Sequence, residues 1–285
     1  MSLSSVQRAV LLTAAVLATV SCSSSDDGGS PAAPSSEGGA YLALGDSVPF
    51  GYRGGERSSE YEEAGNFTGY PELVGDALGL EVLNAACPGE TTASLLDATA
   101  QSNGCENSRT SPDGFRDDYP LHVDYASAEQ SQLDYAVETL KARGDVELVT
   151  LQVGANDGFL CQATTADRCS ADLGVVVDTV GENVATALDA LRTDAGYDGR
   201  LVVVTYYSLD YADETTTTGV ERLNAALISA AEAVDVEVAN AFDPFATEAA
   251  GGSPVDAGLV LPDDVHPTEK GQRLLADAVI SALDG

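Results

Sequence analysis

The sequence has few basic residues, no tryptophan and a single methionine. Its 285 residues contain 13 Lys+Arg against 46 Asp+Glu, a formal net charge of -33, and Lys141 and Lys270 are the only lysines. A nucleic acid partner is therefore not expected, because a phosphate backbone would be repelled rather than neutralised. The charge indicates a solvated acidic surface, since no run of carboxylates has the spacing of a calcium-binding loop.

Histidine is also scarce, and no Cys-x-x-Cys pair is present, so metal binding is the weaker interpretation of the cysteines. An even number of cysteines in an exported domain predicts disulfides instead. Four cysteines allow three pairings. Proximity in the sequence favours Cys87 with Cys105 and Cys161 with Cys169.

The N-terminal segment has no apolar run long enough to span a membrane. Arg8 precedes an apolar stretch from Ala9 to Val20, which predicts a secretory signal peptide over residues 1–22. Thr19 to Cys22 resembles a bacterial lipobox, whose cysteine is lipidated and becomes the new N-terminus, although that motif prefers Leu where Thr19 stands. We expect Cys22 to anchor the protein to the membrane; the alternative is a plain signal peptide cleaved elsewhere.

Residues 23–39 are rich in Ser, Gly, Pro and Asp and predict a flexible tether. Residues 40–285 are long enough to form one domain with a full hydrophobic core. The whole chain is 44% hydrophobic and 21% charged, which is typical of a globular protein. We expect this domain to be a monomer.

Short apolar runs alternate with amphipathic stretches throughout the domain. Buried strands are predicted over 40–46, 81–87, 147–154, 200–208 and 237–245. Helices are predicted around 70–78, 92–99, 127–143, 172–195, 216–233 and 268–283. This alternation predicts an α/β fold, a three-layer α/β/α sandwich around a parallel sheet of about five strands. Residues 103–124 form a long irregular insertion, whose role is open.

Three polar or flexible stretches follow predicted strands. They contain Ser47, Gly89 and Asn156, and ligand sites of parallel sheets lie beyond the carboxyl ends of the strands. Ser47 can serve as a hydroxyl nucleophile. The backbone N–H groups of Ser47 and Gly89 and the side-chain amide of Asn156 are candidate donors for an oxyanion.

A candidate base lies near the C-terminus, in the stretch Leu-Pro-Asp-Asp-Val-His. His266 can accept a proton from a serine hydroxyl, and a carboxylate on the same loop can hold the required imidazole tautomer. Asp263, three residues before His266, is the predicted orienting acid. Its neighbour Asp264 is the alternative.

These stretches together resemble the blocks of the SGNH (GDSL-type) hydrolase family. The blocks are Gly45-Asp46-Ser47, Gly89, Gly154-Ala155-Asn156-Asp157 and Asp263-Asp264-Val265-His266, in the family's order. The resemblance spans about residues 40–283 and implies a flavodoxin-like fold and a secreted esterase or lipase.

For individual residues the resemblance implies the following. Ser47 attacks the ester carbonyl, His266 acts as general base and then acid, and Asp263 orients His266. Ser47, Gly89 and Asn156 stabilise the oxyanion, and no metal or organic cofactor takes part. Asp46 and Asp157 brace the loops.

Each residue also has a purely structural interpretation. Ser47 could cap a helix, Gly89 could serve only as a turn glycine, and Asn156 could form an Asx turn. His122, in the insertion, is expected to be a surface or loop-packing residue. Three tyrosines after the fourth strand could line a pocket or merely pack: Tyr206, Tyr207 and Tyr211.

The leading hypothesis is an exported serine esterase or lipase that acts on small-molecule or lipid esters through an acyl-enzyme. One alternative keeps the same residues but acts as a carbohydrate deacetylase or a phospholipase. Another is a surface-anchored binding protein without activity. Acyl-chain length cannot be read from the residues, because the pocket walls come from loops.

Overall fold

The computed structural model of the chain describes residues 38–284. The predicted signal peptide, Cys22 and the tether up to residue 37 lie outside the described residues. Residues 38 and 39 lead directly into the first strand, so the domain begins where its first apolar run begins.

The core of the domain is a parallel five-stranded sheet in the order β2-β1-β3-β4-β5. The strands are β1 (Ala40–Gly45), β2 (Glu81–Asn84), β3 (Val146–Gln152), β4 (Arg200–Val204) and β5 (Glu237–Ala239). Leu42 of β1 lies between Leu83 of β2 and Val149 of β3. This is the flavodoxin-like strand order. β2 is added on one side of β1 and the later strands on the other, which leaves a crevice at the carboxyl ends of β1 and β3. The predicted fold class is confirmed.

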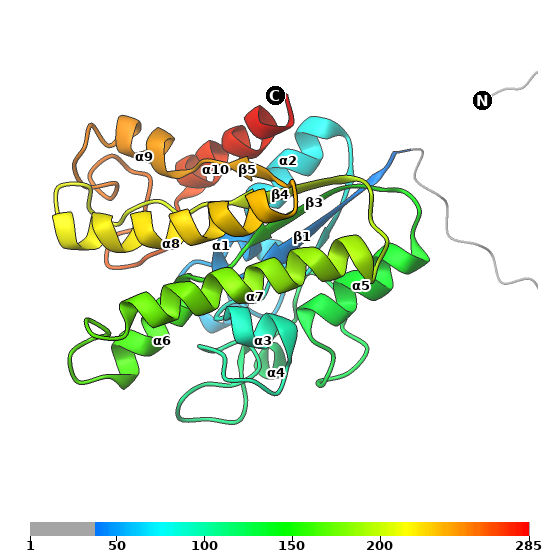
Figure 1. The fold of residues 1–285 in the computed structure, drawn as a ribbon, viewed down its shortest axis with the longest axis horizontal. Coiled ribbons are helices and arrows are strands. Elements are labelled where there is room, and N and C mark those ends of the chain that lie inside the picture. Colours follow the sequence, from blue (N-terminus) through cyan, green and yellow to red (C-terminus); the bar gives the residue numbers. More distant parts are fainter. Residues whose placement is uncertain (1–37, 285) are drawn as a thin grey trace, which may run out of the picture. The chain divides into compact units, whose positions relative to one another are not determined.

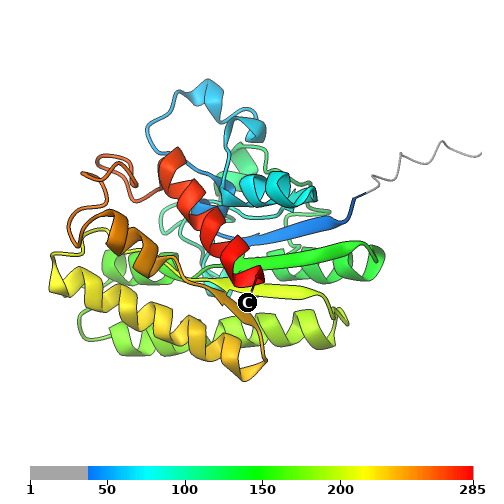
Figure 2. The same ribbon diagram turned by 90° about the horizontal axis from the view of Figure 1, so that it is seen from above.

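Helices cover both faces of this sheet and account for the near-continuous burial of β1, β3 and β4. α3 (Thr92–Leu96), α5 (Gln132–Ala142) and α7 (Leu173–Thr193) pack together, and α8 (Glu214–Ala233) lies along α7 (Figure 1). α2 (Tyr70–Leu78) packs with α10 (Glu269–Leu283). Figure 2 shows the strands between α7 and α8 on one side and α2 on the other.

Several elements differ from the sequence-based predictions. β2 ends at Asn84 and β4 at Val204, before the predicted ends at 87 and 208, and α5 begins at Gln132 rather than at 127. The strand expected over 237–245 ends at Ala239, and the chain enters α9 (Phe242–Glu248), because the Asn240 side chain accepts the Asp243 N–H and turns the backbone. α6 (Ala155–Thr164) was not predicted, since its residues lack a clear apolar periodicity. The predicted insertion contains the short α4 (Phe115–Asp118), and three further short elements surround the first strand's end: α1 (Ser47–Phe50), η1 (Ser58–Glu60) and η2 (Ala64–Asn66).

Two disulfides close loops at the carboxyl edge of the sheet. Cys87 pairs with Cys105 and Cys161 with Cys169, at Cα–Cα distances of 5.6 and 5.3 Å. This is the pairing that proximity in the sequence favours. The Cys87–Cys105 disulfide links the segment after β2 to the insertion. The Cys161–Cys169 disulfide links α6 to the loop before α7.

None of the helices within residues 38–284 is long and apolar enough to cross a membrane.

Candidate active site

Ser47 stands at the first position of α1, directly after the carboxyl end of β1. The turn between them requires glycine at position 45, which has φ of +141°, and a Cβ there would lie 2.0 Å from the Gln152 carbonyl oxygen. Asp46 then caps α1 by accepting the Val48 N–H at 2.9 Å. The backbone thus ends the strand sharply and presents Ser47 at the edge of the sheet.

Ser47 belongs to a chain of hydrogen bonds that joins two ends of the sequence. Its Oγ lies 2.8 Å from Nε2 of His266, and Nδ1 of His266 lies 2.6 Å from Oδ1 of Asp264. With Nδ1–H donating to the carboxylate, Nε2 is free to accept the hydroxyl proton. This arrangement can raise the nucleophilicity of the Ser47 oxygen.

The prediction that Asp263 orients His266 is wrong in this geometry. Asp263 occupies a left-handed position of the loop, with φ of 58°, and its side chain is exposed. Asp264 instead faces inward, where its carboxylate also accepts the N–H groups of Gly54, at 2.8 Å, and Val265, at 2.7 Å. The tight turn places the carboxylate two residues before His266 next to the imidazole, rather than the one three residues before it.

Burial and charge act in opposite directions on this pair. Burial lowers the pKa of His266 below its ordinary value, although the Asp264 charge and hydrogen bond act to raise it. For Asp264, burial acts to raise the pKa, but the charge of His266 and the hydrogen bond from Gly54 hold it below its ordinary value. The pair is therefore neutral imidazole and carboxylate at neutral pH, the form that a general base requires.

The three residues predicted to supply oxyanion donors, Ser47, Gly89 and Asn156, border one cavity together with His266. The Oδ1 atom of Asn156 accepts a hydrogen bond of 2.9 Å from Nδ2 of Asn103, which fixes which end of the Asn156 amide is the donor. Its NH₂ group is then available to a ligand oxygen in the cavity. Asn103 was not predicted from the sequence, because it lies in the irregular insertion.

Gly89 is held rigidly beside this cavity. It has φ of +89°, and a Cβ there would approach the Asn103 oxygen and the Cys105 nitrogen to 2.8 Å. Its carbonyl accepts the Asn103 N–H, at 2.8 Å, and the Cys87–Cys105 disulfide joins the segments on either side. Only glycine fits at position 89, so there is a steric reason for a glycine among the sequence blocks.

Asp46 and Asp157 do brace the loops, as the resemblance implies. Oδ2 of Asp46 accepts the Tyr206 hydroxyl at 2.5 Å, and burial raises the Asp46 pKa to about 7 against these hydrogen bonds. Asp157 accepts the N–H and the hydroxyl of Thr92, at 3.0 and 2.6 Å. These bonds tie α1 to the end of β4 and α6 to α3.

Gln132, whose role the sequence analysis missed, reaches the same turn from α5. Its side chain bonds both the N–H and the carbonyl of Gly45, and its Nε2 also donates to Oε2 of the buried Glu90 at 2.9 Å. A glutamine at the start of an amphipathic helix carries no sequence signal for such a role. The two backbone groups before Ser47 are thereby satisfied in the interior.

Of the remaining aromatic candidates, Tyr206 and Tyr207 border the cavity, whereas His122 and Tyr211 do not. His122 packs on Phe50 with ring centroids 4.7 Å apart and donates to its carbonyl at 3.0 Å, which agrees with the predicted packing role. Tyr207 borders the cavity and donates to the Val265 carbonyl at 2.7 Å, and Tyr211 donates to that of Phe242. Tyr52, which was not predicted, packs edge-on against the His266 ring, with centroids 4.8 Å apart.

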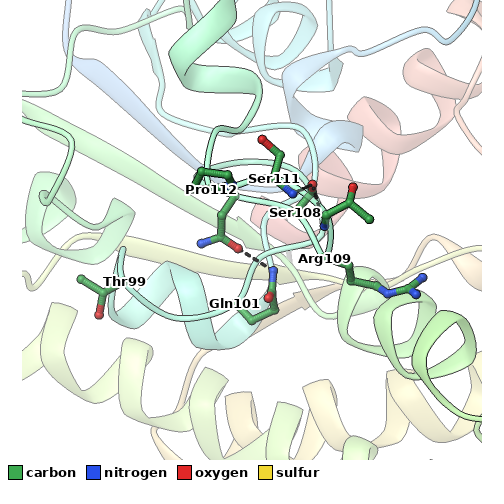
Figure 3. A pocket seen from close by; sticks show the side chains of 8 residues that line it. Thr99, Gln101, Ser108, Arg109, Ser111 and Pro112 are labelled. Atoms are coloured by element: carbon green, nitrogen blue, oxygen red, sulfur yellow. Dashed lines mark hydrogen bonds between the residues drawn. The ribbon is translucent and has the colours of Figure 1, made fainter.

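The cavity at Ser47 has a volume of about 850 Å³. A second, shallower depression lies in and beside the insertion, where the exposed Gln101 and Arg109 and the half-buried Ser108 gather (Figure 3). That depression contains none of the predicted site residues. The predicted residues Ser47, Gly89, Asn156 and His266 border the cavity at the carboxyl edge of the sheet instead.

One cluster in the described residues has the composition of a metal site, Cys87, Glu90 and Cys105. Its two sulfur atoms are joined in a disulfide, so neither is a thiolate ligand. The Glu90 carboxylate already accepts hydrogen bonds from Ser94 and Gln132. The cluster is part of the scaffold behind Gly89.

These features define a class of protein: a flavodoxin-like α/β domain with a serine at the carboxyl end of its first strand. The GDSL-like lipase/acylhydrolase family model matches residues 43–274. The chain belongs to this family of ester hydrolases. A search of curated protein sequences returned no match.

Solved structures with the same fold include several esterases and lipases. A catalytic mutant of the acetylxylan esterase Axe2 from Geobacillus stearothermophilus is 16% identical, with a TM-score of 0.55, and the match covers 87% of this chain and 95% of that chain. The lipase Lip_vut3 from a goat rumen metagenome is 15% identical, with a TM-score of 0.54 and coverages of 85% and 96%. A putative GDSL-like lipase from Parabacteroides merdae is 15% identical, with a TM-score of 0.53 and coverages of 86% and 95%. At these identities the likeness concerns the fold.

Proposed function

We propose that this protein is an exported serine esterase that hydrolyses carboxylic esters through an acyl-enzyme formed on Ser47. The observation that carries the proposal is the continuous hydrogen-bond chain from Ser47 through His266 to Asp264 at the mouth of a large cavity. Membership of the GDSL-like family supports ester hydrolysis as the reaction.

In the first half of the reaction, Ser47 Oγ attacks the ester carbonyl while its proton passes to Nε2 of His266. Asp264 stabilises the imidazolium that forms and holds its tautomer. The negative charge that develops on the carbonyl oxygen is stabilised by the N–H groups of Ser47 and Gly89 and the amide of Asn156. His266 then protonates the departing alcohol, and the acyl group remains on Ser47.

In the second half, water replaces the alcohol. His266 takes a proton from the water, the resulting hydroxide attacks the acyl carbonyl, and the tetrahedral intermediate uses the same donors. Its collapse breaks the bond to Ser47 Oγ, which recovers its proton from His266, and releases the acid. Because Asp264 remains a carboxylate throughout, it supports both proton transfers.

The test is hydrolysis of p-nitrophenyl acetate by purified protein and by Ser47→Ala and His266→Ala. We expect both variants to lose activity by a factor on the order of 10⁴–10⁶, as such residues do in serine hydrolases. Ser281→Ala, an exposed helix position, is the matched control and should retain full activity. Retained turnover in Ser47→Ala would refute Ser47 as the nucleophile. Absence of turnover in the parent together with failure of a fluorophosphonate to label Ser47 would favour a binding protein.

We further propose that the chain is exported and anchored through a lipid on Cys22. The apolar stretch from Ala9 to Val20 and the lipobox-like Thr19 to Cys22 support this, as does the presence of two disulfides, which persist in oxidising compartments. Mass spectrometry of the N-terminal peptide from membranes is the test. An unmodified Cys22, or an N-terminus at another residue, would contradict it.

A further inference from the structure

The cavity at Ser47 continues well beyond the reacting atoms. It passes Gly154, at the end of β3, and runs between the first halves of α7 and α8. Figure 1 shows these two helices side by side, with α6 at the same end. The volume of about 850 Å³ is near the upper end of the range for small-molecule sites, far more than an acetyl group fills.

Branched apolar side chains form the walls of this extension. A Cβ on Gly154 would lie 2.9 Å from Val180 Cγ1 and 3.2 Å from Leu223 Cδ1, so both side chains reach the backbone two residues before Asn156. Farther along, the lining is Phe159, Leu173, Val176, Val177, Leu209 and Val220. All six are only partly buried, because one side of each faces the cavity.

Polar residues appear only at the far margin of the extension. Gln162, Asp167, Arg168 and Ser170, from the loop that the Cys161–Cys169 disulfide closes, border it on one side, and Thr215 and Thr216 of α8 on the other. The first four are exposed. The apolar passage is therefore of limited length, with the candidate reacting group at one end and a polar margin at the other.

We propose that this passage binds the acyl chain of a medium-chain fatty ester, such as an octanoyl ester. The inference rests on the proposed function, since the chain is placed by its carbonyl at Ser47. Each methylene buried against Val and Leu side chains strengthens binding by roughly fourfold. A sugar ring in the same passage would leave its hydroxyl groups without hydrogen-bond partners, which favours a fatty acyl group over an acetylated glycan.

Gly219 of α8 offers a direct test, because it borders the passage and a Cβ there would meet nothing within 4 Å. Gly219→Leu should narrow the passage, its Cβ enters open space, and leucine is a better helix former than glycine. Gly174→Leu is the matched control. Gly174 is an exposed α7 glycine with equally open surroundings, and it does not border the cavity.

The measurement is kcat/KM for p-nitrophenyl octanoate and for p-nitrophenyl acetate. The octanoate ester is kept below the concentration at which it forms micelles. We expect the parent to prefer octanoate by at least about tenfold. Gly219→Leu should lose at least about tenfold on octanoate and stay within about twofold on acetate. Gly174→Leu should match the parent on both esters. Circular dichroism and thermal unfolding establish that both variants are folded.

The outcomes separate this inference from the proposed function. Ser47-dependent acetate hydrolysis without an octanoate preference, or equal loss of both activities in folded Gly219→Leu, would overturn the acyl passage and leave the serine esterase intact. Faster acetate release from acetylated xylo-oligosaccharides than octanoate hydrolysis would also overturn it. Hydrolysis that persists in Ser47→Ala would instead remove the proposed function itself.

Discussion

The side-chain amide of Gln132 bonds both backbone polar groups of Gly45, two residues before the proposed nucleophile. Both residues are buried, so no water competes for these groups. A helix on one face of the sheet thereby fixes the turn that presents Ser47. The position of the serine depends on this contact across 87 residues of sequence.

Gln132→Leu should lower both stability and activity. It leaves the Gly45 N–H and carbonyl buried without partners, and each orphaned group costs about 1–3 kcal/mol. We expect the free energy of unfolding to fall by a few kcal/mol in urea titrations, and kcat to fall more than KM rises, because the turn before Ser47 loses its support. An unchanged unfolding free energy and an unchanged kcat in Gln132→Leu would contradict this role of Gln132.

Substitution of the two neighbouring aspartates should distinguish their roles. Asp264→Asn should lower kcat for p-nitrophenyl acetate by about 10²–10⁴, because the neutral amide does not stabilise the imidazolium. Asp263→Asn should leave kcat within about twofold, since the exposed Asp263 side chain makes no hydrogen bond to His266 in the described residues. Asparagine also tolerates the left-handed backbone at position 263. Comparable losses in both variants would count against the assignment of Asp264.

The pH dependence of kcat/KM should follow the protonation of His266. The base must be neutral, so activity should be full above the pKa of His266 and fall as the pH drops through it. Burial lowers that pKa, which places the acid limb below the ordinary value of about 6.5. Asp264→Asn removes a charge that raises the pKa, so its residual activity should have a still more acidic limb. A limb above pH 7 in the parent would be incompatible with this environment.

Asp46 should make stability depend on pH in the opposite sense to an ordinary carboxylate. Its pKa is about 7 when folded and near 3.8 when unfolded, so the folded state holds a proton that the unfolded state releases between these values. Its contribution to stability therefore falls as the pH rises through this window, by at most about 1.4 kcal/mol per pH unit. Asp46→Asn removes this dependence and keeps a helix-capping oxygen. The measurement is the free energy of unfolding in urea for the parent and for Asp46→Asn, each at pH 4.5 and at pH 7.5. If this free energy changes by the same amount between the two pH values in both proteins, Asp46 is not protonated in the folded state.

The two disulfides should contribute unequally. Cys87–Cys105 closes a loop with a sequence separation of 18, and Cys161–Cys169 one of 8. Loop-closure entropy then makes the first worth about 0.7 kcal/mol more in unfolding free energy. Replacement of both Cys87 and Cys105 by Ser should also raise KM, since it loosens the segment around Gly89. Replacement of both Cys161 and Cys169 by Ser should lower kcat/KM for p-nitrophenyl octanoate more than for p-nitrophenyl acetate. Equal unfolding midpoints for the two variants would contradict the entropic argument.

The apolar runs predicted the five strands and the residues at their carboxyl ends, and the alternation of these runs with amphipathic helices predicted the parallel arrangement. Buried parallel strands are nearly continuous in hydrophobicity, so they are visible locally. The end of β5 was misplaced because an Asn240 side chain, rather than hydrophobicity, decides where the backbone turns. α6 was missed because the glycine and polar residues at its start hide a helical period.

The sequence by itself determined the fold class and the favoured disulfide pairing, and it predicted that Ser47, Gly89, Asn156 and His266 belong to one site. The fold class and the pairing follow from local patterns, whereas the site prediction follows from the rule that brings parallel strand ends together and from the resemblance to a known family. Only the tertiary structure decided between Asp263 and Asp264, because the choice depends on which side chain a tight turn directs inward. The roles of Gln132 and Asn103 and the apolar passage between α7 and α8 likewise arise from contacts between residues far apart in the chain, which no local pattern encodes.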